Sequence, residues 1–201
     1  MFAISLGILS GLLQIYGYIF YARKTILGHI KPNTASWGLW AFGAVLESGS
    51  YIFATGDWAK NILPAACALS AIAFFFLALY KGHFRKLDSF EYLIITLDLI
   101  AILIWWYTES ALYANIYIVL TAVISFIPIF RHAWKNPEQE DAGPWFIWTW
   151  AYALLTVIVI LNFTIWQELI FPVTYIFLSL TLAILSLDSR IPKTFSFRRL
   201  Q

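Results

Sequence analysis

The sequence predicts an all-α membrane protein in which two parallel three-helix bundles are joined by one linker helix. Three observations predict this fold class: an apolar composition, seven long stretches with almost no charge, and an internal repeat. Of the 201 residues, 61% are hydrophobic and 12% are charged, whereas soluble proteins usually carry about 25% charged residues. This composition excludes an ordinary soluble globular enzyme.

Seven stretches are long enough to cross a bilayer, which takes about 20 apolar residues in a helix. Five of them contain no Asp, Glu, Lys or Arg, and two contain one acid each, Glu47 and Asp98. They are apolar nearly all round, which argues against a water-soluble core, and they lack the short alternation of a membrane barrel. We therefore expect membrane helices over residues 2–21, 36–55, 61–80, 92–108, 110–130, 142–167 and 169–187. The first stretch follows no basic segment, so we expect a membrane helix there rather than a secretion signal.

The basic residues fall into alternate connections between these stretches. Twelve of the 13 Lys and Arg residues lie in the first, third and fifth connections and in the basic tail, while Lys60 lies near Asp57, Glu109 and Glu168 in the others. The positive-inside rule then predicts an outside N-terminus and a cytoplasmic C-terminus. We expect a bacterial inner membrane, with the lipid bilayer and a small-molecule substrate as partners. Nucleic acid is not expected, and the sequence leaves open whether the chain forms a homo-oligomer.

An internal repeat appears when the sequence is shifted over itself by 108 residues. The shift superimposes Trp37 on Trp145, Trp40 on Trp148, Trp58 on Trp166, and Pro64 on Pro172. It divides the chain into a first three-helix repeat over residues 1–88, a linker helix over 89–109, and a second repeat with the basic tail over 110–201. Because one helix separates the repeats, both enter the membrane in the same direction. Transporters with parallel repeats bind their substrate near the midplane between the halves.

The two repeats open with related segments, "YGYIFYARKTILGHIKPNTASWGLW" and "SFIPIFRHAWKNPEQEDAGPWFIW". Together with the order of three helices, linker and three helices, these segments resemble the PQ-loop superfamily, which includes SWEET sugar facilitators, lysosomal amino-acid exporters, Pnu vitamin transporters and the KDEL receptor. The resemblance implies a transporter that moves a small neutral or cationic metabolite, such as a sugar, vitamin or amino acid, by alternating access. The likeness to the KDEL receptor leaves open a seven-helix receptor or interaction protein without transport.

Glu47 is the first candidate for a substrate-binding residue. It lies near the expected bilayer centre, where a charged acid costs about 2.5–3.5 kcal/mol on insertion scales. Helical spacing places Trp40, Ser50 and Tyr51 on the same face, and the position 108 residues on is Leu155. Glu47 could couple transport to protons or pair with a cationic substrate; the alternative is a protonated side chain in a helix contact. For Asp98, in contrast, we expect a structural use first, and a role in transport is the alternative.

Further candidates line the expected helices. Trp40 and Trp148 could form a stacking platform or an inner gate, although tryptophan also favours the membrane interface. Gln14 and Asn115 carry amides that need a partner on another helix. The complete set of predicted binding residues is Glu47, Trp40, Trp148, Tyr51, Ser50, Gln14 and Asn115.

Four residues are candidate hinges because glycine and proline loosen a helix. They are Gly17, Pro64, Pro128 and Pro172. In a rocking transporter they would bend, whereas in a static bundle they would only shape the packing. The sequence contains no Gly-rich phosphate cradle, no His/Cys metal cluster and no spacing typical of a nucleophile with its base. We therefore expect no enzyme activity, no cofactor and no metal.

Overall fold

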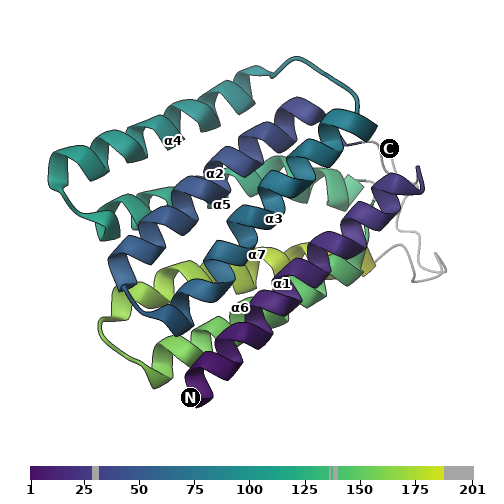
Figure 1. Ribbon diagram of the computed structural model, residues 1–201. Coiled ribbons are helices and arrows are strands. Elements are labelled where there is room, and N and C mark those ends of the chain that lie inside the picture. Colours follow the sequence, from purple (N-terminus) through teal and green to yellow (C-terminus); the bar gives the residue numbers. More distant parts are fainter. Residues whose placement is uncertain (29–31, 136, 138–139, 188–201) are drawn as a thin grey trace, which may run out of the picture.

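The described residues form a bundle of seven α-helices (Figure 1). A computed structural model describes residues 1–28, 32–135, 137 and 140–187. Lys31 and residues 188–201, which are the end of the expected second repeat with its basic tail, lie outside the described part. The elements are α1 Phe2–Ile26, α2 Thr34–Thr55, α3 Trp58–Lys81, α4 Ser89–Thr108, α5 Ala111–Lys135, α6 Ala142–Leu161, the 3₁₀ turn η2 Trp166–Leu169 and α7 Ile170–Leu187.

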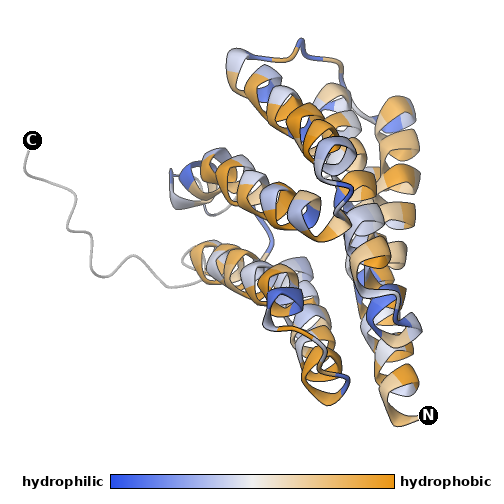
Figure 2. Cartoon of the chain, turned by 90° about the vertical axis from the view of Figure 1, so that its left-hand side faces the viewer, coloured by the Kyte–Doolittle hydropathy of each residue, from blue (hydrophilic) through white to orange (hydrophobic). Residues whose placement is uncertain are grey.

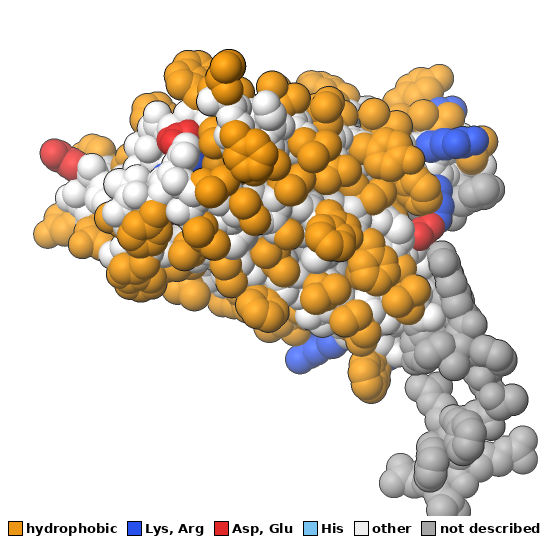
Figure 3. Space-filling view, turned by 90° about the horizontal axis from the view of Figure 1, so that it is seen from below, with side chains coloured by type: hydrophobic (Ala, Val, Ile, Leu, Met, Phe, Trp, Pro, Cys, Tyr) orange, Lys and Arg blue, Asp and Glu red, His pale blue; other side chains and the backbone are white. Residues whose placement is uncertain are grey.

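Six of these helical segments are long and apolar enough to cross a membrane, which indicates an integral membrane protein. Hydrophobic residues predominate along the helices, and hydrophilic residues gather at helix ends and connections (Figure 2). Apolar side chains also cover most of the face seen in Figure 3. Over the described chain as a whole, large apolar side chains such as Leu69, Phe76 and Leu103 are more than half exposed, as expected for surfaces that meet lipid.

The expected span at α2 is not among the six. Its sequence, TASWGLWAFGAVLESGSYIFAT, mixes tryptophan, glycine, serine and one acid with the apolar residues, which lowers its mean hydropathy. The helix contacts α3, α4 and α5, so three neighbours cover much of its surface. Its polar residues Glu47, Ser48 and Ser50 are buried inside the bundle. This helix is therefore an inner one, and its side chains can line an internal site.

Successive helices run in opposite directions, so the connections gather at two ends (Figure 1). The connections α1–α2, α3–α4 and α5–α6 lie at one end, and α2–α3, α4–α5 and α6–α7 lie at the other. We name the first the basic end, after its described Lys and Arg residues, and the second the opposite end. The basic residues that define it are Arg23, Lys24, Lys81, Arg85, Lys86, Arg131 and Lys135.

The helices pack in two similar groups. Within the first, α3 contacts both α1 and α2; within the second, α7 contacts both α5 and α6. Between the groups, α1 packs against α6 and α2 against α5, while α4 lies outside against α2 and α5 (Figure 1). Small residues allow close approach within a group: a Cβ added at Gly7 would lie 2.7 Å from the carbonyl oxygen of Ala59.

Two sequence expectations are corrected at the opposite end. The uncharged run over residues 142–167 is not one helix, because α6 ends at Leu161 and Asn162 caps it before η2 begins. Pro172 was expected inside a helix, where it would break a backbone hydrogen bond. It is instead the third residue of α7, where a first-turn N–H has no helical acceptor and proline is tolerated. Pro64 and Pro128 do lie inside α3 and α5.

Candidate functional site

A cavity of about 750 Å³ lies inside the bundle. All seven α-helices contribute to its wall. Its inner part reaches Glu47 and Tyr175, and at the basic end it extends to Arg85 and Asp88. The side chains of Arg85 and Asp88 are 49% and 54% exposed, so the cavity continues to the protein surface there. The volume suits a small organic molecule.

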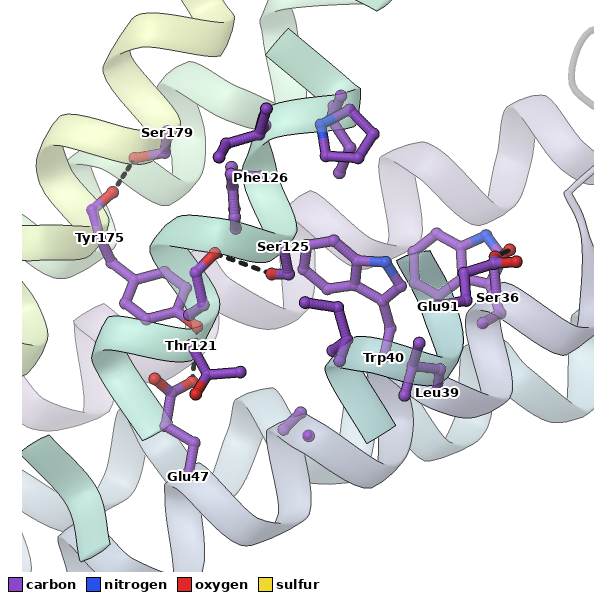
Figure 4. Close-up of a pocket in the computed structure, with 18 of the residues that line it drawn as sticks. Ser36, Leu39, Trp40, Glu47, Glu91, Thr121, Ser125, Phe126, Tyr175 and Ser179 are labelled. Atoms are coloured by element: carbon purple, nitrogen blue, oxygen red, sulfur yellow. Dashed lines mark hydrogen bonds between the residues drawn. The ribbon is translucent and has the colours of Figure 1, made fainter. Parts of the chain in front are cut away.

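Glu47 lies at the inner end of the cavity (Figure 4). The residue is 5% exposed, and the hydroxyl of Tyr175 on α7 donates to its Oε2 at 2.6 Å. Among the described residues, its other carboxyl oxygen, Oε1, has no hydrogen-bond partner. Buried polar atoms are nearly always satisfied in proteins. One carboxyl oxygen of Glu47 is therefore available to a bound molecule or to a proton.

Three predicted binding residues lie behind Glu47 rather than in the cavity wall. Asn115 on α5 donates from Nδ2 to the backbone oxygen of Glu47 at 3.2 Å and to Ser50 Oγ at 3.1 Å. Tyr51 is 1% exposed, and its hydroxyl donates to the backbone oxygen of Glu168 at 3.3 Å. Asn115, Ser50 and Tyr51 do not line the cavity. Their hydrogen bonds hold α2 against α5 and the η2 turn, which fixes the position of Glu47.

The other four predicted residues, Glu47, Trp40, Trp148 and Gln14, do line the cavity. Trp40 packs edge-on against Phe126 with ring centroids 5.3 Å apart. Trp148 donates from Nε1 to the backbone oxygen of Gln14 at 3.2 Å. The Gln14 side chain is buried, and within the described part of the chain its Oε1 has no partner. The two tryptophans thus belong to the cavity wall, one from each group of helices.

Sequence reasoning missed several residues of the wall. Tyr175 lies 128 residues from Glu47, and no local pattern links the two. Tyr152 stacks on Tyr175 with centroids 4.8 Å apart, and its position four residues after Trp148 on α6 could have placed it on the same face. Asp98, expected to be structural, also lines the cavity, as does the single cysteine, Cys67.

Two of the candidate hinges, Gly17 and Pro64, lie at contacts between helices. Gly17 in α1 is buried, and a Cβ there would lie 2.8 Å from Cδ1 of the Trp148 ring. Pro64 is buried in α3, and its carbonyl oxygen accepts from Ser48 Oγ at 2.8 Å. Pro128 in α5 lines the cavity. These placements leave a hinge role for Gly17, Pro64, Pro128 and Pro172 as a prediction.

A buried ion pair lies at the opposite end. Lys60 Nζ lies 2.5 Å from Glu168 Oε2, and the two side chains are 1% and 2% exposed. Lys60 is in the first turns of α3 and Glu168 is in η2, so both are buried rather than in open connections as the sequence suggested. They are 108 residues apart, the same offset that relates the two repeats. Neither lines the cavity.

A second contact joins the groups at this end. Asn162 Nδ2 donates to Asp57 Oδ2 at 2.8 Å, and Asp57 also caps α3 through the N–H groups of Ala59 and Lys60. Partial burial favours the protonated form of Asp57, but the hydrogen bonds from Asn162 and from the two N–H groups and the charge of Lys60 outweigh it and lower the pKa of Asp57. Asp57 is therefore an anion whose hydrogen bond from Asn162 joins the two groups of helices at this end.

Comparison with protein-family models, curated proteins and solved structures finds no match for this chain. Within the described residues, no group of three or more His, Cys, Asp or Glu side chains could hold a metal ion.

Proposed function

We propose that the protein is a transporter that moves a small neutral or cationic metabolite by alternating access between its two groups of helices. The observation that carries this proposal is the asymmetry of the cavity. It is continuous with the surface at the basic end, whereas none of the described residues in the connections of the opposite end lines it, and the buried pair Lys60–Glu168 joins the two groups of helices there. A cavity that reaches the middle of a membrane bundle from one side only is the geometry of one state of such a cycle.

The packing of the helices supports a 3+1+3 arrangement with α4 as the linker. If α1, α2 and α3 correspond to α5, α6 and α7, the order of contacts inside each group is the same. Under this correspondence, the contact α1–α6 becomes α5–α2, which is also present. A two-fold axis between two repeats would relate these two contacts, whereas the smaller contact α3–α6 would map onto α7–α2, which is not among the larger helix contacts. Rocking of one group against the other would then open one end as it closes the other.

We assign the basic end to the cytoplasm, by the positive-inside rule, and the membrane to a bacterial inner membrane. The cavity then faces inward, and the Lys60–Glu168 pair forms the outer seal. Lys24 and Asp141 form an ion pair between α1 and α6 at the basic end. Opening of the outer end would have to break the Lys60–Glu168 pair. The basic end would have to close at the same time, through further contacts like the Lys24–Asp141 pair.

The test is uptake into liposomes. A thermal-shift screen of sugars, vitamins and amino acids on the purified full-length chain selects a ligand, and its labelled form is then offered to proteoliposomes. We expect saturable uptake that Glu47→Gln lowers at least tenfold, because the exchange removes the carboxylate at the inner end. Glu109→Gln, at the exposed α4–α5 connection, is the matched control and should leave uptake unchanged. Tight binding with no flux would instead identify a receptor.

A further inference from the structure

We propose that the cavity binds an organic cation whose charge is shared by two carboxyl groups, Glu47 on α2 and Asp98 on α4. This inference rests on the proposed function for its physiological meaning, but it concerns binding and can be tested without transport. It assigns Asp98 to the binding site and narrows the substrate from a neutral or cationic metabolite to a cationic one.

The two acids face the same stretch of the cavity. Both line it, and the residues are 5% and 4% exposed. A Cβ added at Gly43 would lie 3.4 Å from Asp98 Oδ2, and Gly43 is one helical turn before Glu47 on α2. Residues four apart on a helix have Cβ atoms about 5–6 Å apart. A ligand of modest size in this part of the cavity therefore meets both carboxyl groups.

This part of the cavity lacks a protein cation. Among the described lining residues, the basic side chains are Arg85, Arg131 and His132, and all three lie at the basic end. Arg85 is already paired there, at 2.9 Å from Glu91. Two carboxyl groups in a poorly solvated cavity are costly to ionise unless a cation accompanies them. A positively charged ligand would supply the missing partner.

The buried acid at the opposite end provides an internal comparison. Glu168 is as deeply buried as Glu47 and has a lysine at 2.5 Å. Glu47 has only the Tyr175 hydroxyl at 2.6 Å, and its Oε1 is buried without a partner in the described structure. A ligand N–H placed against Oε1 would give Glu47 the charged partner that Glu168 already has.

Aromatic rings around Glu47 favour an organic cation over a bare metal ion. Tyr18 packs on Trp148 with centroids 5.1 Å apart, and Tyr152 stacks on Tyr175 at 4.8 Å. All four rings line the cavity. Aromatic faces attract ammonium and other organic cations, and they also bind a flat or apolar body. The described residues contain no cluster with enough ligands for a metal ion.

The site is single rather than duplicated. Leu155, which is the equivalent of Glu47 in the second repeat at an offset of 108 residues, is fully buried and apolar. The second group therefore contributes rings but no equivalent acid, and we expect one cation per chain.

Calorimetric titration of the purified full-length protein with matched ligands tests the inference. Benzylammonium and phenethylammonium are compared with their neutral alcohols, and sodium chloride alone serves as the inorganic probe. We expect each ammonium ion to bind at least tenfold more tightly than its alcohol, with one site per chain. Equal affinity for cation and alcohol, or saturable binding of sodium at the same site, would overturn the proposal.

Variants then test the two carboxyl groups. Glu47→Gln and Asp98→Asn should each reduce the preference for the cation at least fivefold, whereas Glu109→Gln should retain it. A preference that survives both substitutions together would refute the assignment. If a variant does not fold, the comparison of cation and alcohol on the native chain still decides. Cation binding without flux would remove the proposed transport alone, and flux of neutral solutes without cation preference would remove this inference alone.

Discussion

The first prediction concerns the Lys60–Glu168 pair. We expect that the removal of one partner changes the side of the membrane from which the cavity is accessible. Both side chains are almost fully buried and lie 2.5 Å apart across the two groups of helices. Removal of one partner of such a pair costs about 3–5 kcal/mol, because the other charge is left buried alone. In Lys60→Met this cost falls on the state that is closed at the opposite end. A state opened there would expose Glu168 to water and escape the cost.

Under the proposed alternating access, we expect a large shift in the equilibrium from the state that is closed at the opposite end to the state that is open there. Since 1.4 kcal/mol corresponds to a factor of ten, 3–5 kcal/mol corresponds to a factor between about 10² and 10³·⁵. The native Cys67 can report it, because it is the only cysteine in the chain and it lines the cavity. A membrane-impermeant thiol reagent is added to vesicles of either orientation, and the rate of labelling is measured.

In the native protein, Cys67 should react faster from the basic end than from the opposite end. Lys60→Met should raise the rate from the opposite end at least tenfold. The double variant Lys60→Met/Glu168→Leu is the matched control: replacement of both partners by apolar residues is often neutral or stabilising, so the closed state should return. Cys67→Ala gives the background. If Lys60→Met leaves the labelling rates from the two sides unchanged, the pair does not act as a seal.

Two further predictions concern helix contacts. Gly17→Ala places a methyl group against the Trp148 ring and should destabilise the protein by about 1–3 kcal/mol, as overpacking does; chemical unfolding measures this, and Trp148→Phe in the same chain should recover part of the loss. A loss that Trp148→Phe does not relieve would show that this contact is not the cause. Asp57→Ala removes the cap of α3 and the partner of Asn162 and should cost about 0.5–2 kcal/mol, with Asp57→Asn costing less; equal losses for the two substitutions would contradict the capping role.

The sequence predicts the helices well where apolar length alone determines them. Six spans follow from hydropathy, because a bilayer requires about 20 apolar residues whatever the tertiary contacts are. The break after Leu161 does not show in the pattern of charges, because the residues around it are uncharged. Asn162 caps the helix there, and its side chain donates to Asp57 from the other group of helices. That contact joins residues 105 positions apart, beyond the reach of any local pattern.

The candidate site was predictable only where local helical spacing places its residues. Glu47 and Trp40 share one face of a helix, so local spacing placed both in the cavity wall. Tyr175 and Asp98 come from helices that only tertiary packing brings to Glu47. The amide of Asn115, which needs a partner on another helix, donates to the backbone oxygen of Glu47 and to Ser50 Oγ, and a substrate-binding role for Asn115 stays a prediction.

The most direct test of alternating access is a distance between the two groups at the opposite end. Trp58 and Trp166 precede Lys60 and Glu168 by two residues each, and both are exposed, at 84% and 63%. Spin labels are attached to Trp58→Cys and Trp166→Cys in a Cys67→Ala background, and the distance between them is measured by pulsed electron paramagnetic resonance. Alternating access predicts two distance populations, of which the longer grows when Lys60→Met is added. A single distance, unchanged by Lys60→Met, would contradict it.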